Sequence, residues 1–146
     1  MQKGLSDLQV FDYIIGHADR NPGNWIYIKD AHNNITGVRG IDNDDSFGQR
    51  WVAKGTTGDQ NEPKTPDVPP VVDVTTAIKI LNLDLGANAN LLAGLSPAEI
   101  TAARDRLQHV KDEIITRARA GHIAVLANEA NPNGQLATLR LLVNGQ

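Results

Sequence analysis

The chain contains no cysteine, so disulfide bonds, thiolate catalysis and cysteine-ligated zinc are all excluded. It also lacks an excess of positive charge: its formal net charge is -3, which gives no general electrostatic reason to bind nucleic acid or an anionic membrane. No apolar run approaches the roughly 18 residues that a membrane-spanning helix needs, and the amino terminus shows no signal-peptide pattern. We therefore expect a globular protein with no transmembrane segment and no nucleic-acid partner.

What the chain does have is the composition of an ordinary globular domain, with 40% hydrophobic and 21% charged residues. Its 146 residues are enough for one hydrophobic core, so we predict a single domain over residues 1–146. It divides into a compact part at about 5–48, an exposed loop rich in Gly, Pro, Thr and Asp at about 49–70, and a helical part at about 71–146. The predicted fold class is α+β, mainly helical, with one small β-hairpin.

The first part begins with a predicted helix from about Asp7 to Ile15. Ser6 and Gln9 have the spacing of a capping box, and the apolar residues that follow recur at helical intervals. Gly16 is a suitable residue to end this helix.

A hairpin is predicted after the polar loop that follows this helix. The stretch "NWIYI" is rich in aromatic and β-branched residues, which is typical of a strand. The turn-rich "KDAHNNITG" and then "VRGID" predict the return strand. Residues 25–28 therefore lead away from the polar loop, and residues 38–41 come back to it.

The third part contains the clearest helix signals. Ser96 is a natural N-cap, Pro97 suits the first helical position, and Glu99 completes a capping box. The Arg and Lys residues of this long helix are assigned to its solvated face. Shorter helices are predicted at 72–83 and, after an "NPNGQ" turn, at 136–143. The buried stripe of the long helix is predicted from apolar residues three and four positions apart: Ile100, Ala103, Leu107, Val110 and Ile114.

The stretch "HADRNPGN", between the first helix and the hairpin, holds the side chains with the most chemical potential. Antiparallel pairing of the strands places Asn24, at the entry of the hairpin, close to Asp42 at its exit. Asp19 precedes Asn24 by five residues, across a turn tightened by Pro22 and Gly23. Two carboxylates in one cluster repel each other and lose hydration, so a cation should offset them. Mg²⁺ prefers oxygen ligands, keeps several waters and leaves positions for phosphate oxygens.

Asp19, Asn24 and Asp42 match what phosphoryl transfer needs: a carboxylate near the acceptor hydroxyl, and an Asn and an Asp that hold the metal-bound phosphates. Together, "HADRNPGN", the hairpin and "IDNDDSF" resemble the catalytic and metal-binding loops of protein-kinase-like enzymes. The resemblance is to the atypical branch that holds phosphatidylinositol 3- and 4-kinases and actin-fragmin kinase, and bacterial effector kinases share the pattern. It covers about residues 5–47, roughly a third of the chain.

By this resemblance, Asp19 is the catalytic aspartate that orients or deprotonates the acceptor hydroxyl, and Asn24 and Asp42 bind Mg²⁺ or Mn²⁺ together with ATP. His17 braces the loop, and Arg20 supports the loop or meets a phosphate. The implied fold is the carboxy-terminal lobe of a kinase. The implied partners are a nucleotide and a protein, lipid or small-molecule hydroxyl acceptor, although the negative net charge argues mildly against a lipid surface. The implied location is the cytoplasm, or outside the producing cell as an exported effector.

The chain departs from the kinase pattern ahead of the catalytic loop, where only 18 residues precede Asp19. There is no glycine-rich loop to cover phosphates, no lysine-bearing strand, and no room for either. We therefore expect the carboxy-terminal lobe of a longer protein, without its amino-terminal lobe, that binds ATP weakly or not at all when alone. Asn43 stands where ordinary protein kinases have the Phe of Asp-Phe-Gly, and the lipid-kinase branch tolerates Asn there.

Two other interpretations compete with this one. EF-hand spacing applied to "DNDDS" puts Phe47 at the sixth place, normally glycine, and Ala53 at the twelfth, normally glutamate, so a calcium-binding EF-hand loop is excluded. Asp44 and Asp45 are instead assigned to solvated or N-capping positions. The second alternative is a non-catalytic, kinase-derived module whose helical lobe binds another protein. The missing amino-terminal lobe favours this module, and the presence of all three predicted site residues counts against it.

Overall fold

The computed structural model describes residues 2–17, 20–44, 46–48, 68–125 and 131–145, so most of the loop predicted at 49–70 lies outside the described residues. Over these ranges the chain is mainly helical, with four α-helices and one two-stranded antiparallel hairpin, which confirms the predicted α+β class. No helix within these ranges is long and apolar enough to span a lipid bilayer. The elements follow in this order: α1 (Gln2–Ile15), β1 (Trp25–Lys29), β2 (Ile35–Gly40), α2 (Val74–Asn82), α3 (Pro97–Arg119) and α4 (Pro132–Asn144).

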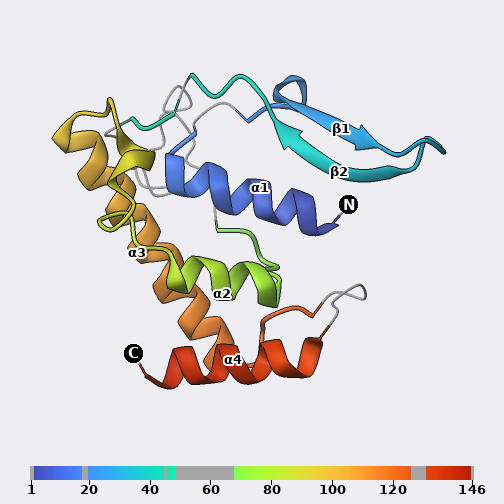
Figure 1. Cartoon of the computed structure of the whole chain (residues 1–146), viewed down its shortest axis with the longest axis vertical. Coiled ribbons are helices and arrows are strands. Elements are labelled where there is room, and N and C mark those ends of the chain that lie inside the picture. The colour runs from blue at the N-terminus through green and yellow to red at the C-terminus, as the bar shows by residue number, and fades with distance from the viewer. Residues whose placement is uncertain (1, 18–19, 45, 49–67, 126–130, 146) are drawn as a thin grey trace, which may run out of the picture.

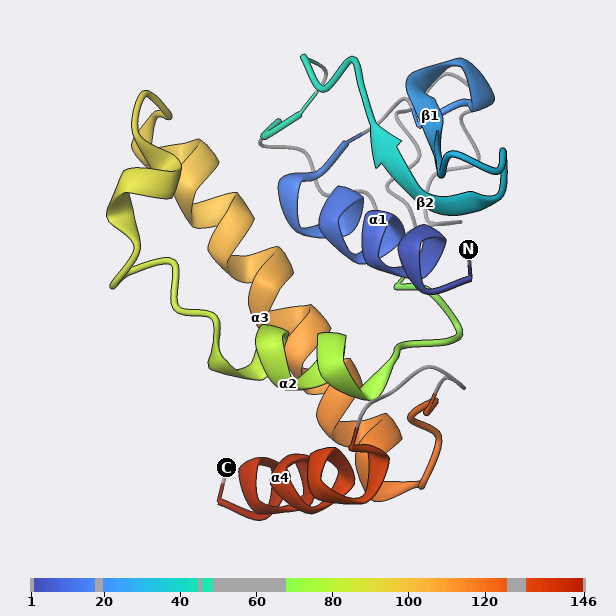
Figure 2. The same cartoon turned by 45° about the vertical axis from the view of Figure 1, so that its right-hand side comes forward.

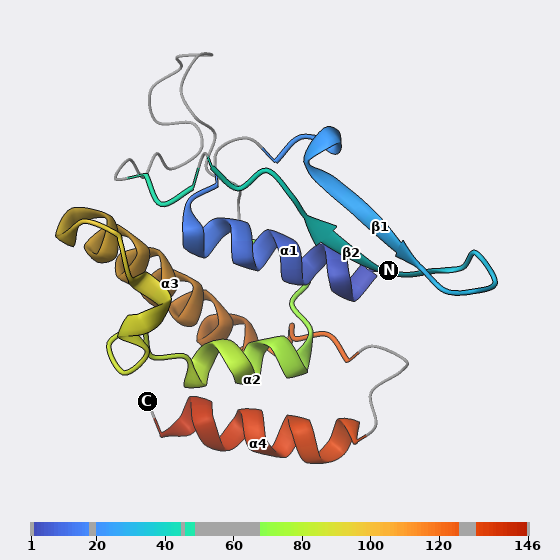
Figure 3. The ribbon, with the colours of Figure 1, turned by 45° about the horizontal axis from the view of Figure 1, so that its top comes forward.

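The hairpin, α1, α2 and α4 succeed one another from one end of the molecule to the other, and α3 runs alongside the three other helices (Figure 1). The hairpin lies on one side of α1 and α2 lies on the other, as the tilted view also shows (Figure 3). α3 contacts α1, α2 and α4, while β2 contacts α1. The hairpin is therefore attached to the helical part mainly through α1.

α1 begins earlier than the sequence predicts. Ser6, assigned to an N-cap, lies inside the helix, is buried, and donates its hydroxyl hydrogen to the carbonyl oxygen of Val71 at 2.5 Å. The predicted start near Asp7 is therefore wrong, because the serine hydroxyl bonds a distant segment and not a main-chain amide at the helix start. The predicted end is confirmed: Gly16 has φ +65°, a left-handed conformation that glycine adopts without steric cost.

Two glycines allow the hairpin to approach α1 closely. A Cβ atom on Gly4 would lie 3.1 Å from Cγ1 of Val38, and one on Gly40 would lie 2.8 Å from Cδ1 of Leu8, which is closer than two carbon atoms pack without displacement. Toward the other helices, α1 contributes to the main hydrophobic core, which it enters with Val10, Tyr13 and Ile14.

The hairpin forms as predicted, with an earlier start to its second strand. Trp25 pairs with Gly40 and Ile28 pairs with Gly37, and the register shifts between Ile28 and Lys29. Because the pairing is antiparallel, the entry of β1 and the exit of β2 are adjacent. This is the arrangement on which the predicted metal site depends.

α3 confirms its predicted capping box: the Ser96 hydroxyl accepts from the amide of Glu99 at 3.3 Å, and the Glu99 carboxylate accepts from the amide of Ser96 at 2.7 Å. Its predicted stripe is buried, apart from Ile100, which is partly buried. α4 starts earlier than predicted, because the Asn131 side chain accepts a hydrogen bond from a first-turn amide and caps a helix that begins at Pro132. The predicted "NPNGQ" turn is thus the beginning of the helix.

α2 forms within the predicted range and begins at a charged cluster that also holds α1. Asp73 is buried and accepts hydrogen bonds from the amides of Thr75 and Thr76, at 3.0 and 3.4 Å. Nζ of Lys3 lies 2.9 Å from Oδ1 of Asp73 and 3.2 Å from Oδ2 of Asp7, so it links the two helices. Burial raises the pKa of the Asp73 carboxyl, but the hydrogen bonds from Thr75 and the hydrogen bond and charge of Lys3 outweigh it, and the pKa lies below its ordinary value.

We expect the stabilisation that Asp73 provides to disappear in acid. Its folded-state pKa is lowered, so the contribution is complete above about pH 4 and is lost as the pH falls through the lowered value. Asp73→Asn keeps a capping side chain without the charge and should reduce the free energy of unfolding at neutral pH by about 1 kcal/mol. Urea denaturation should show this difference shrinking as the pH approaches about 2. A constant difference would contradict the assignment, and Asp112→Asn, an exposed site on α3, serves as the control.

Candidate active site

Arg20 is the centre of the polar loop and uses all five of its N–H groups. Its Nε and Nη2 atoms donate to the two carboxylate oxygens of Asp12 on α1, at 2.9 and 2.8 Å. Nη1 donates to the carbonyl oxygens of Asn24 and Ile41 at 2.6 and 2.7 Å, and Nη2 also donates to Oδ1 of Asn43 at 2.6 Å. One side chain therefore joins α1, the loop before β1 and the residues after β2.

The Asp12–Arg20 ion pair is buried, with side chains 1% and 8% exposed. Two parallel charge-assisted hydrogen bonds make this the strong, orientation-specific form of a salt bridge. Removal of either partner would leave the other charge buried and unpaired. With every N–H group engaged, Arg20 holds the loop against α1 and has no donor left for a phosphate oxygen.

The hairpin brings Asn24 and Asp42 into adjacent positions. The amide of Ile41 donates to the carbonyl oxygen of Asn24 at 2.9 Å, immediately beyond the pairing of Trp25 with Gly40. Asp42 follows directly, with φ +57°, a left-handed conformation that Asp tolerates better than most residues do. Asn24 is half-buried and Asp42 is exposed, so the two predicted metal ligands lie where the protein meets solvent.

The turn that leads to Asn24 is built around Pro22 and Gly23, as predicted. The side-chain oxygen of Asn21 accepts from the amide of Gly23 at 2.8 Å, and the carbonyl oxygen of Asn21 accepts from the amide of Asn24 at 3.0 Å. These bonds close a short 3-10 turn over Pro22–Asn24. The position of Asn24 is therefore fixed from both sides, by this turn and by the hairpin.

Asp19, the predicted catalytic aspartate, lies outside the described residues. His17, two residues before it, is buried, with 1% of its surface exposed, and its amide donates to the carbonyl oxygen of Asp12 at 2.9 Å. The bracing role expected of the His17 side chain stays a prediction.

Asn24 and Asp42 offer an amide oxygen and a carboxylate, which are the kinds of ligand that Mg²⁺ combines with water and phosphate oxygens. Within the part of the chain that the structure describes, no three or more His, Asp or Glu side chains gather closely enough to hold a metal ion. A cation bound by one carboxylate, one amide, water and phosphate does not require such a group. Asn24 and Asp42 are therefore of the residue types that a hard divalent cation shared with a phosphorylated ligand would take as ligands.

The segment after Asp42 returns to the end of α1. Phe47 has φ +63°, and its amide donates to the carbonyl oxygen of Ile15 at 2.5 Å. A left-handed conformation is unfavourable for a bulky residue, so the contacts around Phe47 must impose it. Its side chain packs against the hydrophobic core. The segment that carries Asp42 is thus anchored at one end by the hairpin and at the other by α1.

Two residues on which this loop depends were not predicted as parts of the site. Asp12 lies four residues after Leu8 and three before Ile15, on a buried face of α1, and a carboxylate in such an apolar stripe signals a buried partner. Gly40 lies so near Arg20 that a Cβ atom there would be 2.9 Å from Nη2. A glycine inside a strand often marks such an approach, so both signals are present in the sequence.

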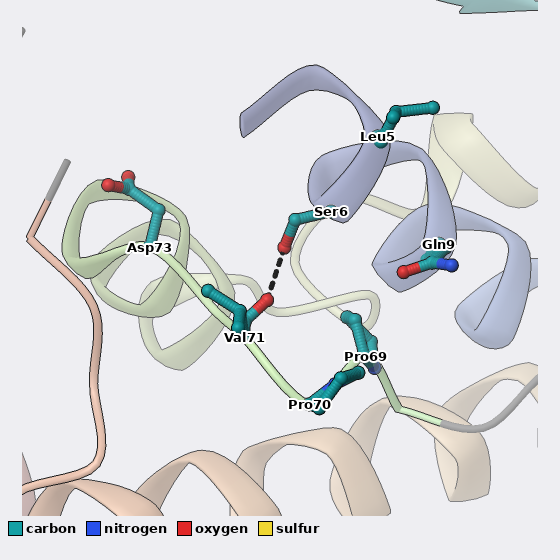
Figure 4. Close-up of a pocket in the computed structure, with 7 residues that line it drawn as sticks. All are labelled: Leu5, Ser6, Gln9, Pro69, Pro70, Val71 and Asp73. Atoms are coloured by element: carbon teal, nitrogen blue, oxygen red, sulfur yellow. Dashed lines mark hydrogen bonds between the residues drawn. The ribbon is translucent and has the colours of Figure 1, made fainter. Parts of the chain in front are cut away.

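Two hollows in the described surface lie away from Asn24 and Asp42. One, of about 340 Å³, lies between α1 and residues 69–73, and its two walls are joined by the hydrogen bond from Ser6 to Val71 (Figure 4). The other, of about 470 Å³, lies between the end of α3 and α4. Neither hollow is lined by a predicted site residue.

Arg20→Lys should lower the free energy of unfolding by about 3 kcal/mol, because a lysine ammonium cannot replace the two-pronged bond to Asp12 and the bonds to three other groups. The measurement is urea denaturation at neutral pH. Arg39→Lys, on the exposed side of β2, is the matched control and should stay within about 0.5 kcal/mol of the wild type. Equal stability of the two variants would show that Arg20 does not hold the loop.

Comparisons with known proteins add no evidence about this site. No protein-family model, no curated protein and no solved structure matches the chain.

Proposed function

We propose that this chain is the carboxy-terminal lobe of an ATP- and Mg²⁺-dependent phosphotransferase of the atypical kinase type. The observation that carries the proposal is the hydrogen bond from the amide of Ile41 to the carbonyl oxygen of Asn24, because it brings Asn24 beside Asp42 at the mouth of the hairpin. An Asn and an Asp in this relation suit a metal ion that also binds phosphate oxygens.

Each residue has a distinct role in the proposed reaction. Asn24 and Asp42 hold the cation, which, when bound, offsets the negative charge of the transferred phosphoryl group. Asp19 orients the acceptor hydroxyl and accepts its proton as the hydroxyl oxygen forms a bond to phosphorus and the bond to the nucleoside diphosphate breaks. His17 and Arg20 maintain the loop that carries Asp19 and Asn24.

The framework around the loop supports this chemistry. Phosphoryl transfer depends chiefly on positioning and on stabilisation of charge, so the groups involved must be held in a defined geometry. The buried Asp12–Arg20 pair and the bonds from Arg20 to the carbonyl oxygens of Asn24 and Ile41 provide such a hold.

The alternative, a non-catalytic module that binds another protein, rests on a different observation. Large apolar side chains of the hairpin are exposed, which is typical of an interaction surface when they lie together. Ile26 and Ile28 share one face of β1, and Tyr27 and Ile35 are exposed as well; each of the four is 40% to 47% exposed. The two functions are separated by whether Asn24 and Asp42 bind a metal ion.

We expect Mn²⁺ to bind at the mouth of the hairpin. Added to the isotope-labelled chain, this paramagnetic ion should broaden the amide NMR signals of residues 23–24 and 41–43 before those of other regions. Asp42→Asn should raise the apparent dissociation constant by at least about tenfold, because it removes the charged ligand. The method detects weak binding, which suits a site that is completed by a nucleotide.

Asp44→Asn is the matched control for this experiment. It removes the same charge two residues after Asp42, at a position that is assigned to solvent. It should change the dissociation constant only about twofold to threefold, because an exposed carboxylate that does not contact the ion attracts it weakly in water. Broadening centred on the Asp7–Asp73 cluster, or binding that Asp42→Asn leaves intact, would contradict the proposed site.

A further inference from the structure

Arg106, on α3, is completely buried, although the Arg and Lys residues of this helix are predicted to lie on its solvated face. That prediction is wrong for Arg106, because the residue lies three positions after Ala103 and four before Val110, on the buried stripe itself. Its guanidinium reaches the carboxyl end of α1, which α3 passes closely (Figure 2). There Nε donates to the carbonyl oxygen of Ile14 at 2.9 Å, and Nη1 donates to that of Gly48 at 3.1 Å.

The burial of this charge is costly. Arg106 forms no ion pair with a carboxylate among the described residues, and its Nη2 atom is buried without a hydrogen-bond partner there. Burial lowers the pKa of the guanidinium, which remains charged at neutral pH. An apolar side chain of similar length would avoid the large desolvation penalty that a buried ion carries. Stability of the fold alone therefore does not account for an arginine at this position.

Gly16 is shaped to accept this guanidinium. A Cβ atom at Gly16 would lie 2.7 Å from Cζ of Arg106, so no other residue fits without displacing the arginine. Gly16 also has φ +65°, and the next residue is His17, at the start of the candidate catalytic loop. On the other side, Gly48 follows Phe47, whose amide bonds Ile15.

We propose that Arg106 is a positioning residue of the candidate active site, an inference that rests on the proposed function. Its guanidinium bridges two main-chain segments from the α3 side. One is the end of α1, which leads into His17 and Arg20, and the other is residues 46–48, which follow Asp42. By bonding the carbonyl oxygens of both, it sets the spacing between the catalytic loop and the metal-binding segment. The proposal accounts for the buried charge, for the glycine at 16 and for the anchored end of the segment after Asp42.

The test replaces the Arg106 guanidinium, which bridges the two segments, with an apolar side chain of similar length. Arg106→Met should accelerate hydrogen exchange at the Phe47 amide by at least about tenfold, because the segment it anchors opens more often. Exchange in β1 and β2 should stay unchanged. The same variant should weaken Mn²⁺ binding by about tenfold or more, as loss of an outer contact of a metal site does. Arg104→Met, an exposed neighbour on α3, should alter neither quantity.

Gly16→Ala provides an independent perturbation, because its methyl group displaces the guanidinium while Arg106 is retained. It should reproduce both effects of Arg106→Met. Gly121→Ala is its control: Gly121 has a similar φ of +75°, but a methyl carbon there would meet no atom within 4 Å, so it shares the backbone strain alone. If Arg106→Met fails to fold, Arg106→Lys replaces it, because lysine keeps the charge but cannot span both carbonyl groups. Arg106→Lys should then show the faster hydrogen exchange at the Phe47 amide.

Unchanged hydrogen exchange at the Phe47 amide in folded Arg106→Met would overturn the proposal. Normal Mn²⁺ affinity of Arg106→Met would overturn it too, provided that Asp42→Asn weakens Mn²⁺ binding as expected. Absence of Mn²⁺ binding by the wild type would refute the proposed function separately. In that case the exchange measurement alone decides whether Arg106 positions the segment.

Discussion

The buried contact between the Asp12 carboxylate and the Arg20 guanidinium determines where the polar loop lies. Two charges removed from water are stable only when each satisfies the other and the remaining polar atoms are bonded. Arg20 meets this condition by bonding two carbonyl oxygens and an amide side chain in addition to Asp12. The loop, the entry of β1 and the exit of β2 are consequently constrained together, in addition to the hairpin pairing that makes Asn24 and Asp42 adjacent.

Arg106 provides a comparable hold from the opposite direction. Whereas Arg20 organises the mouth of the hairpin, Arg106 connects the end of α1 with residues 46–48 from within the helical part. Both guanidinium groups require a glycine at the point of closest approach, Gly40 for the first and Gly16 for the second. The candidate site is thus framed by two arginines and two glycines that come from the end of α1 and the loop after it, from β2 and from α3.

Elements whose signals are local could be predicted from the sequence. The Ser96 capping box and the stripe of α3 lie within one helix, and the hairpin follows from its turn residues and from the strand composition on both sides. The start of α1 could not, since Ser6 bonds Val71 across the fold and this tertiary partner overrides the local preference. The start of α4 has a local signal, because Asn131 caps the amide of Gly134 and Pro132 follows it, but the same residues are also typical of a turn. The candidate site divides in the same way.

The adjacency of Asn24 and Asp42 follows from antiparallel pairing, which strand composition and turn chemistry already indicate. The buried partner of Arg20 could not be identified from the sequence, because several carboxylates lie within reach along the chain and only the packing of α1 selects Asp12. Arg106 is harder still, since it contacts main-chain atoms and leaves no complementary residue type to search for. That preference for main-chain atoms has a consequence for how this protein tolerates change. Arg106 recognises the path of the backbone through carbonyl groups that every amino acid carries, so the side chains at positions 14 and 48 can vary while these bonds persist. Drift in sequence can retune what the loop recognises while its scaffold stays the same.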